Sequence, residues 1–221
     1  MDWVEFAAAF AVFFLTHSLP LRPALRAPLQ AALGRRGFTL AYSALSLAAL
    51  AWLIAAAGRA PHVPLWDWAP WQPHVPLVIM LPVCVIVALA IGRPNPLSFG
   101  GARNAAFDPA RPGIVGLHRH PLLLALALWA GVHVVANGDL AHVLLFGTFG
   151  GFALLGMRLI DRRKQREMGA RWQALRAAID TAPRWPLAPF GTTAVRLALG
   201  ALLYGALIWA HPHLFGASPL P

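Results

Sequence analysis

Six long apolar runs dominate the sequence and restrict the folds open to it. They cover roughly residues 3–19, 38–57, 75–91, 121–136, 140–157 and 194–210. Hydrophobic residues make up 58% of the 221 residues and charged residues only 12%. A membrane-spanning helix needs about 20 apolar residues, with a range of about 17–25. The runs therefore predict an all-α, polytopic integral membrane helix bundle with six transmembrane helices, and they disfavour a soluble helical protein.

The positions of the basic residues predict how this bundle is oriented. All but one of the 18 Lys and Arg residues lie in the links between runs one and two, three and four, and five and six. Only Arg59 lies on the other side. Basic loops stay in the cytoplasm, so both termini are predicted to face the periplasm from a bacterial inner membrane. The net charge of +10 then indicates anionic lipid on the cytoplasmic face, not nucleic acid, as a partner.

Residues 160–179 show a different pattern from the six runs. Apolar residues fall near one helical face of this segment, and Arg and Lys fill the other. The apolar residues are Ile160, Met168, Trp172, Leu175 and Ile179. This pattern is typical of an amphipathic helix that lies in the inner membrane interface.

The fifth run also carries a possible packing motif. Gly147 and Gly151 stand at GxxxG spacing, and glycines at this spacing let a neighbouring backbone approach closely. We therefore expect close helix packing at these two positions. Residues 1–215 are interpreted as a single transmembrane domain, followed by a short tail at 216–221.

Two of the nine histidines are embedded among apolar residues: His17 ends the first run, and His133 lies inside the fourth. An ionisable residue within a membrane helix is costly to insert and indicates a functional site. Two neutral imidazoles from different helices suffice to ligate a haem in a dry pocket. His17 and His133 are the best such pair by burial, and His133 with His142 is a weaker alternative. A structural, hydrogen-bonded role for His133 is equally compatible with the sequence.

His120, within Arg119-His120-Pro121, belongs to a separate site. The 13 residues of helix between His120 and His133 rise about 20 Å, and the two side chains point to nearly opposite faces. An interfacial residue that starts a proline-led helix explains His120. The single cysteine excludes an internal disulfide, and the chain has no HExxH, nucleophile-elbow or P-loop motif. Zinc hydrolysis therefore has no support.

Three segments together resemble the NnrU family in sequence and in order. They are THSLPLRPALRAPLQAALGRRGFTLAYSALSLAAL, GRAPHVPLWDWAPW and HRHPLLLALALWAGVHVVANGD, and the resemblance runs from about residue 1 to residue 215. The family is named for its association with nitrite and nitric oxide reduction genes in denitrifiers, and it is related to 15-cis-zeta-carotene isomerase. In the isomerase, two histidines hold a membrane haem b, one in a His-Ser motif and one in a Trp-x-x-x-His segment. These positions match His17-Ser18 and Trp129 to His133.

The resemblance implies a haem b with His17 and His133 as iron ligands and Trp129 beside them. His120 and Arg119 would then lie near a haem propionate or a lipid headgroup. The protein would be a haem-dependent, isomerase-like enzyme acting on a hydrophobic small molecule, or an accessory to nitrogen-oxide respiration. The isomerase has a cysteine three residues before its second histidine, where this chain has Ala130.

The Arg119-His120-Pro121 segment also resembles a second group, the integral membrane methyltransferases that act on isoprenylcysteine or phospholipid. In that group, such a segment and a downstream acidic and aromatic stretch bind S-adenosylmethionine at the inner interface. Glu167, Gly169 and Trp172 fall loosely in that place. A third interpretation is a non-catalytic assembly partner of a respiratory complex. A visible spectrum would separate the haem protein from the other two.

Overall fold

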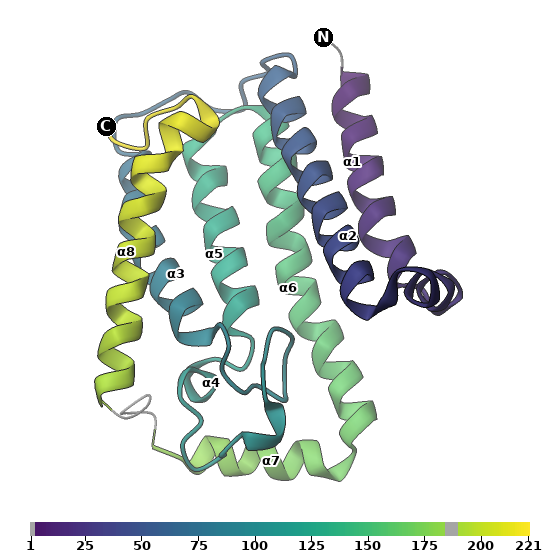
Figure 1. Cartoon of the computed structure of the whole chain (residues 1–221). Coiled ribbons are helices and arrows are strands. Elements are labelled where there is room, and N and C mark those ends of the chain that lie inside the picture. Colours follow the sequence, from purple (N-terminus) through teal and green to yellow (C-terminus); the bar gives the residue numbers. More distant parts are fainter. Residues whose placement is uncertain (1–2, 184–189) are drawn as a thin grey trace. The chain divides into compact units, whose positions relative to one another are not determined.

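The computed structural model describes residues 3–183 and 190–221, and its regular structure is helical (Figure 1). Among these residues the only strand-type pairing is an isolated bridge between Pro64 and Asp139, so the all-α prediction is confirmed. The α-helices are α1 (Trp3–Ser18), α2 (Pro23–Arg59), α3 (His74–Ala90), α4 (Ile114–Leu117), α5 (Pro121–Ala136), α6 (Leu140–Met168), α7 (Ala170–Thr181) and α8 (Phe190–Phe215). Two short 3-10 helices are η1 (Leu19–Leu21) and η2 (Asn104–Ala106).

Each of the six apolar runs forms a helix. In the described part of the chain, four helices are long and apolar enough to cross a membrane: Trp3–Leu21, Pro23–Arg59, Leu140–Met168 and Gly191–Phe215. α3 and α5 are also apolar but have 17 and 16 residues, at or just below the lower limit of about 17 for a span. A helical membrane protein is therefore supported, and the count of six spans stays a prediction.

The chain forms two compact units, and each is described by itself. The first comprises Met1–Asp67 and Gly138–Leu145. Within it α1 packs along α2, and an ion pair between Glu5 and Arg59 joins the start of α1 to the end of α2. α2 bends at Gly34, whose φ of 69° lies in the left-handed region that glycine adopts without strain. The buried residues of α2 all follow this bend, so its apolar second part makes the contact with α1.

The second unit comprises Trp68–Asn137 and Phe146–Pro221. In this unit α3 packs against both α5 and α8. Arg196 of α8 donates from one guanidinium nitrogen to the carbonyl oxygens of Ala88, at 2.5 Å, and Ile91, at 2.9 Å. The last carbonyls of a helix have no partner within the helix, so this arginine satisfies the C-terminal end of α3.

The contact between α5 and α6 uses other glycines than the two that the sequence singled out. A Cβ atom on Gly150 would lie 3.5 Å from the Cβ of Ala130, and one on Gly156 would lie 3.6 Å from a leucine of α5. Around Gly147 and Gly151, no described atom lies within 4 Å of such a Cβ. The close packing expected at Gly147 and Gly151 is therefore not found, because GxxxG spacing does not determine which face of the helix its neighbour covers.

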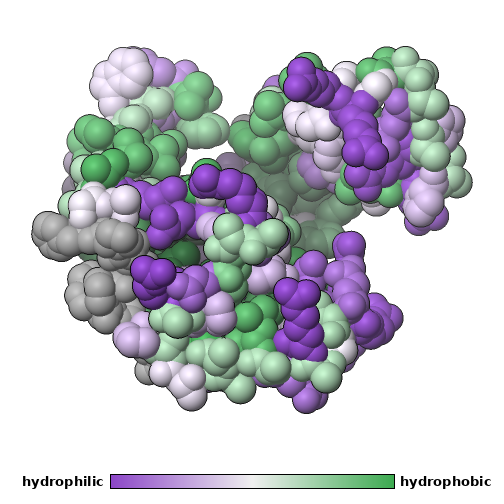
Figure 2. Space-filling view, turned by 60° about the horizontal axis from the view of Figure 1, so that its bottom comes forward, coloured by the Kyte–Doolittle hydropathy of each residue, from purple (hydrophilic) through white to green (hydrophobic). Residues whose placement is uncertain are grey.

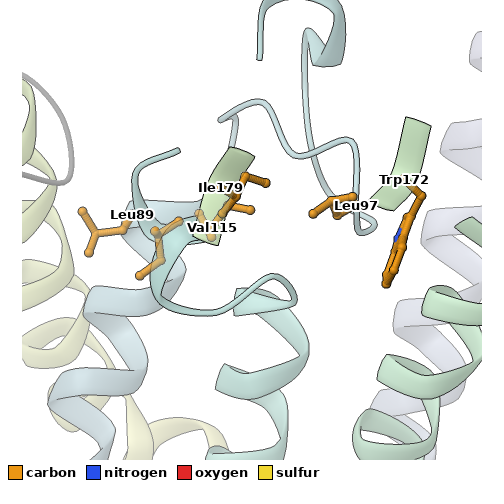
Figure 3. Packing of buried hydrophobic residues seen from close by; sticks show 7 residues of the cluster. Leu89, Leu97, Val115, Trp172 and Ile179 are labelled. Atoms are coloured by element: carbon orange, nitrogen blue, oxygen red, sulfur yellow. The ribbon is translucent and has the colours of Figure 1, made fainter. Parts of the chain in front are cut away.

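A hydrophobic cluster joins α7 to the end of α3 and to the segment before α5 (Figure 3). Its buried members are Leu89, Ala90, Leu97, Ile114, Val115, Trp172 and Ile179, with Met168 and Leu175 partly buried against them. The single interfacial helix expected over 160–179 is wrong in its bounds, since Gly169, with a φ of 55°, separates α6 from α7. The apolar face of α7 packs on protein, because the segment between α3 and α5 supplies apolar partners that periodicity cannot reveal.

Candidate functional site

α5 carries a histidine near each end, and the two lie in different environments. His120 is the residue that immediately precedes the helix, and Pro121 occupies its first position, where the missing N–H of proline costs nothing. His133 lies in the last turn. The 13 residues between them correspond to about 20 Å of helix. The structure therefore has two separate sites on α5, as the sequence predicted.

His133 lies in an aromatic environment at the end of α5. Its Nδ1 atom is 2.7 Å from the carbonyl oxygen of Trp129, one turn earlier. The ring centroid of His133 lies 5.2 Å from that of Trp129 and 4.9 Å from that of Phe146 on α6. The predicted neighbour relation of Trp129 and His133 is therefore confirmed. The side chain is partly buried between apolar rings.

His17, in the first unit, shows the same arrangement in the last turn of α1. Its Nδ1 atom lies 2.9 Å from the carbonyl oxygen of Phe13, again four residues earlier, and its ring lies 4.0 Å from that of Phe13. Tyr42 of α2 donates from its hydroxyl to the carbonyl oxygen of His17 at 3.2 Å. The end of α1 that carries His17 is thereby fixed to α2.

The hydrogen bonds of these two histidines determine their tautomers. A carbonyl oxygen only accepts, so Nδ1 carries a proton in both rings, and in the neutral form of each ring Nε2 keeps its lone pair. Metal-binding histidines generally donate their other ring N–H in this way, which fixes the ring and exposes the ligating nitrogen. Within residues 3–183 and 190–221, neither His17 nor His133 has a hydrogen-bond partner at Nε2. In both rings the described contacts therefore use Nδ1 alone.

His142, the alternative partner of His133, is held by a carboxylate. Asp139 precedes α6, and its two carboxylate oxygens accept from the backbone N–H of His142 at 3.2 Å and from its Nδ1 at 2.6 Å. The first N–H groups of a helix have no partner within the helix, so Asp139 caps α6. This arrangement gives His142 a structural role at the start of the helix.

The second site is a buried polar network around His120, whose side chain is only 1% exposed. The Nδ1 atom of His120 lies 2.9 Å from the hydroxyl of Ser98, and its Nε2 atom lies 3.0 Å from a carboxylate oxygen of Asp161. Arg119 donates to the same carboxylate, from Nε at 2.9 and 3.0 Å and from a terminal nitrogen at 2.5 Å. Asn95 donates to the backbone carbonyl of Arg119 at 3.0 Å.

The donors and acceptors of this network follow from its chemistry. An ionised carboxylate only accepts, so Nε2 of His120 carries the proton and Nδ1 accepts from the hydroxyl of Ser98. Burial lowers the pKa of His120, and the Asp161 carboxylate opposes part of this effect. The hydrogen bonds that Arg119 donates to the Asp161 carboxylate raise the pKa of Arg119. His120 is therefore neutral with both ring nitrogens engaged, and it ties the segment before α5 to α6.

The sequence analysis found His120 and Arg119 but not Ser98, Asn95 or Asp161. Asn95 and Ser98 belong to one short segment, Asp161 lies far from them in the chain, and none of the three has a distinctive motif around it. Asp161 gave one usable signal, since it is the only acid between Asp139 and Glu167 and is followed directly by Arg162 and Arg163. An acid directly before a run of basic residues is expected to pair either with one of those residues or with a basic residue elsewhere in the fold.

A metal ion held by protein side chains alone needs a cluster of ligating residues. The described part of the chain contains no group of three or more His, Cys, Asp or Glu side chains that could hold a metal ion. A haem places a smaller demand on the protein, because two axial histidines suffice. The haem prediction therefore depends on two histidines alone and needs no larger cluster of protein ligands.

Comparison with known proteins yields one match. A family model described as NnrU protein matches residues 5–219, nearly the whole chain. The comparisons with curated proteins and with solved structures found no match.

Proposed function

Because the chain belongs to the NnrU family, we propose that it is a bacterial inner-membrane protein that binds haem b through His17 and His133. The observation that carries this proposal is the shared tautomer of the two rings. Each donates from Nδ1 to a carbonyl of its own helix, which leaves Nε2 as the ligating nitrogen. When bound, the haem supplies a one-electron redox centre.

The side chains around each histidine support this choice. His133 lies against the rings of Trp129 and Phe146, and His17 lies against Phe13 with Tyr42 close by. Such apolar and aromatic surroundings keep water away from a porphyrin face, and exclusion of water is one way in which a protein sets the potential of the iron.

The position of Ala130 bears on the type of haem protein. In the isomerase that the chain resembles, a cysteine stands three residues before the second histidine. Ala130 is fully buried here and lies against Gly150 of α6, so this position offers no thiol. We therefore favour an accessory or electron-transferring role in nitrogen-oxide respiration over an isomerase that exchanges its iron ligands.

The surroundings of His120 do not favour the methyltransferase alternative. A cofactor at the inner interface would need His120 and its neighbours to be accessible, but His120 is enclosed and both its ring nitrogens are engaged. Glu167 is paired with Arg163 and Lys164, and Trp172 is buried in the hydrophobic cluster with α3. These contacts therefore do not support S-adenosylmethionine binding at these residues.

The visible spectrum of the full chain, purified after haem supplementation, tests the proposal. We expect a Soret band with a low-spin bis-histidine signature, and we expect either His17→Ala or His133→Ala to abolish that signature. His120→Ala should leave it intact. His142→Ala should also leave it intact if His17 and His133 are the ligands, and should abolish it if His133 and His142 are. A wild-type protein without a Soret band would refute the haem proposal.

Reporter fusions test the proposed orientation. Alkaline phosphatase is active only in the periplasm, so a fusion after Pro221 should be active if both termini face that side. A fusion after Thr181, at the end of α7, should be inactive because the basic ends of α6 and α7 are expected in the cytoplasm. The opposite pattern would show that both termini face the cytoplasm.

A further inference from the structure

α6 is longer than a membrane requires, and its last turns carry a cluster of basic residues. Its 29 residues extend over about 43 Å, whereas the hydrocarbon core of a bilayer is about 30 Å thick. Counted from Leu140, about 20 residues cross that core and bring the chain to Leu159. The turns after Leu159 therefore lie at the level of the lipid headgroups.

A surface depression lies at this level. Its volume is about 520 Å³, and its walls are Leu159, Arg162, Gln165 and Arg166. The spacing of Leu159, Arg162 and Arg166 puts them on one face of the helix. The apolar side chain of Leu159 thus lies on the membrane side of the depression. The guanidinium groups of Arg162 and Arg166 and the amide of Gln165 lie further from the membrane core. Figure 2, which turns this end of the molecule forward, shows hydrophilic residues spread over it.

No described acidic residue neutralises the charges in the depression. Within the described residues, neither Arg162 nor Arg166 forms an ion pair. The adjacent basic residues differ, because Arg163 and Lys164 both pair with Glu167, at 2.6 and 3.1 Å. The same helical turns therefore hold two basic residues that share one carboxylate and two that have no ion-pair partner among the described residues.

We propose that this depression binds the phosphate group of an anionic phospholipid from the cytoplasmic leaflet. Two guanidinium groups can each present paired N–H donors to phosphate oxygens, and the amide of Gln165 supplies another donor. Leu159 contacts the lipid where its acyl chains begin. A headgroup that carries its own positive charge would bring that charge close to Arg162 and Arg166, so a phospholipid with net negative charge is preferred.

Binding of short-chain phospholipids to the full chain in detergent tests this site. We expect phosphatidylglycerol to bind more tightly than phosphatidylcholine. Arg162→Gln with Arg166→Gln should weaken phosphatidylglycerol binding by about 30-fold, which corresponds to about 1 kcal/mol for each charge near the surface. Arg163→Gln with Lys164→Gln is the matched control. It removes the same charge from the same turns and should weaken binding by less than about threefold, since these residues are already paired.

Several outcomes would overturn the proposal. Equal losses in the two double variants would show that only the net charge of α6 matters. Equal affinity for phosphatidylcholine would remove the preference for anionic lipid. Inorganic phosphate that binds as tightly as phosphatidylglycerol at equal ionic strength would identify a site for a soluble anion. If the Gln pair does not fold, Arg162→Lys with Arg166→Lys replaces it: a measurable loss supports the guanidinium contacts, and wild-type affinity contradicts them.

Discussion

The network around His120 predicts that Asp161→Asn destabilises the second unit. The amide of asparagine can still accept from Nε2 of His120, but its NH2 group then faces the donors of Arg119. Breaking a buried ion pair costs about 3–5 kcal/mol. The Arg119 side chain is 36% exposed and that of Asp161 is 15% exposed, so water can solvate the released guanidinium. We therefore expect a smaller loss, about 2 kcal/mol of the free energy of unfolding.

The assay is the free energy of unfolding from a denaturing-detergent titration, with hydrogen exchange as a local measurement. Backbone amides between Asn95 and Pro121 should exchange faster in the variant, because Asp161 fixes that segment to α6. Asp108→Asn is the control, since the Arg111–Asp108 pair is 83% and 42% exposed and an exposed pair contributes little to stability. If Asp161→Asn and Asp108→Asn lose the same small free energy, the network adds no net stability and this reasoning fails.

Two further predictions concern pH and packing. Burial lowers the pKa of both His118 and His120 below the ordinary value of 6.5, so the unfolded chain binds more protons than the folded one below that pH. The free energy of unfolding should then fall as the pH drops below about 6.5, and His120→Gln should flatten this dependence in detergent titrations at several pH values. Gly138→Ala would place a Cβ 2.5 Å from the carbonyl oxygen of Trp66 and should cost about 1–3 kcal/mol. Gly205→Ala, where no described atom lies within 4 Å, should cost nothing measurable by the same titration.

The apolar runs predicted the helices well because the bilayer leaves the chain few choices. Backbone groups in hydrocarbon have to be satisfied within the segment, and a helix achieves this by itself. The fourth run was expected at 121–136, and α5 spans Pro121–Ala136. The fifth run was expected to end near residue 157, but α6 continues to Met168, because a helix does not have to stop where its side chains become charged.

The contacts of the helix faces were predicted less well. Gly150 and Gly156 contact α5, whereas Gly147 and Gly151 do not, and all four belong to the same helix. The face that meets a neighbour depends on where the neighbour lies, and this is a property of the tertiary structure. The apolar face of α7 illustrates the same point, since its partners come from the segment between α3 and α5 and not from lipid.

The same difference between contacts within a helix and contacts between segments applies to the candidate site. Trp129 was placed beside His133 correctly because residues four apart share a helical face. The contact of His120 with Ser98 and Asp161 joins residues 22 and 41 positions away in the chain. No periodic pattern connects them, and each is an ordinary residue in its local sequence. The sequence therefore predicted contacts within one helix and missed the network that joins three segments.

Burial by itself is a poor guide to which histidines of this chain suit the haem proposal. His120 is the most buried histidine among those described, yet both its ring nitrogens are used by neighbouring side chains. It could bind iron only by giving up one of these hydrogen bonds within a closed network, which would leave a buried polar group without a partner. His17 and His133 each satisfy one nitrogen with a carbonyl of the same helix. Helix geometry thus fixes each ring through Nδ1 alone, which is why the haem proposal rests on His17 and His133 and not on His120.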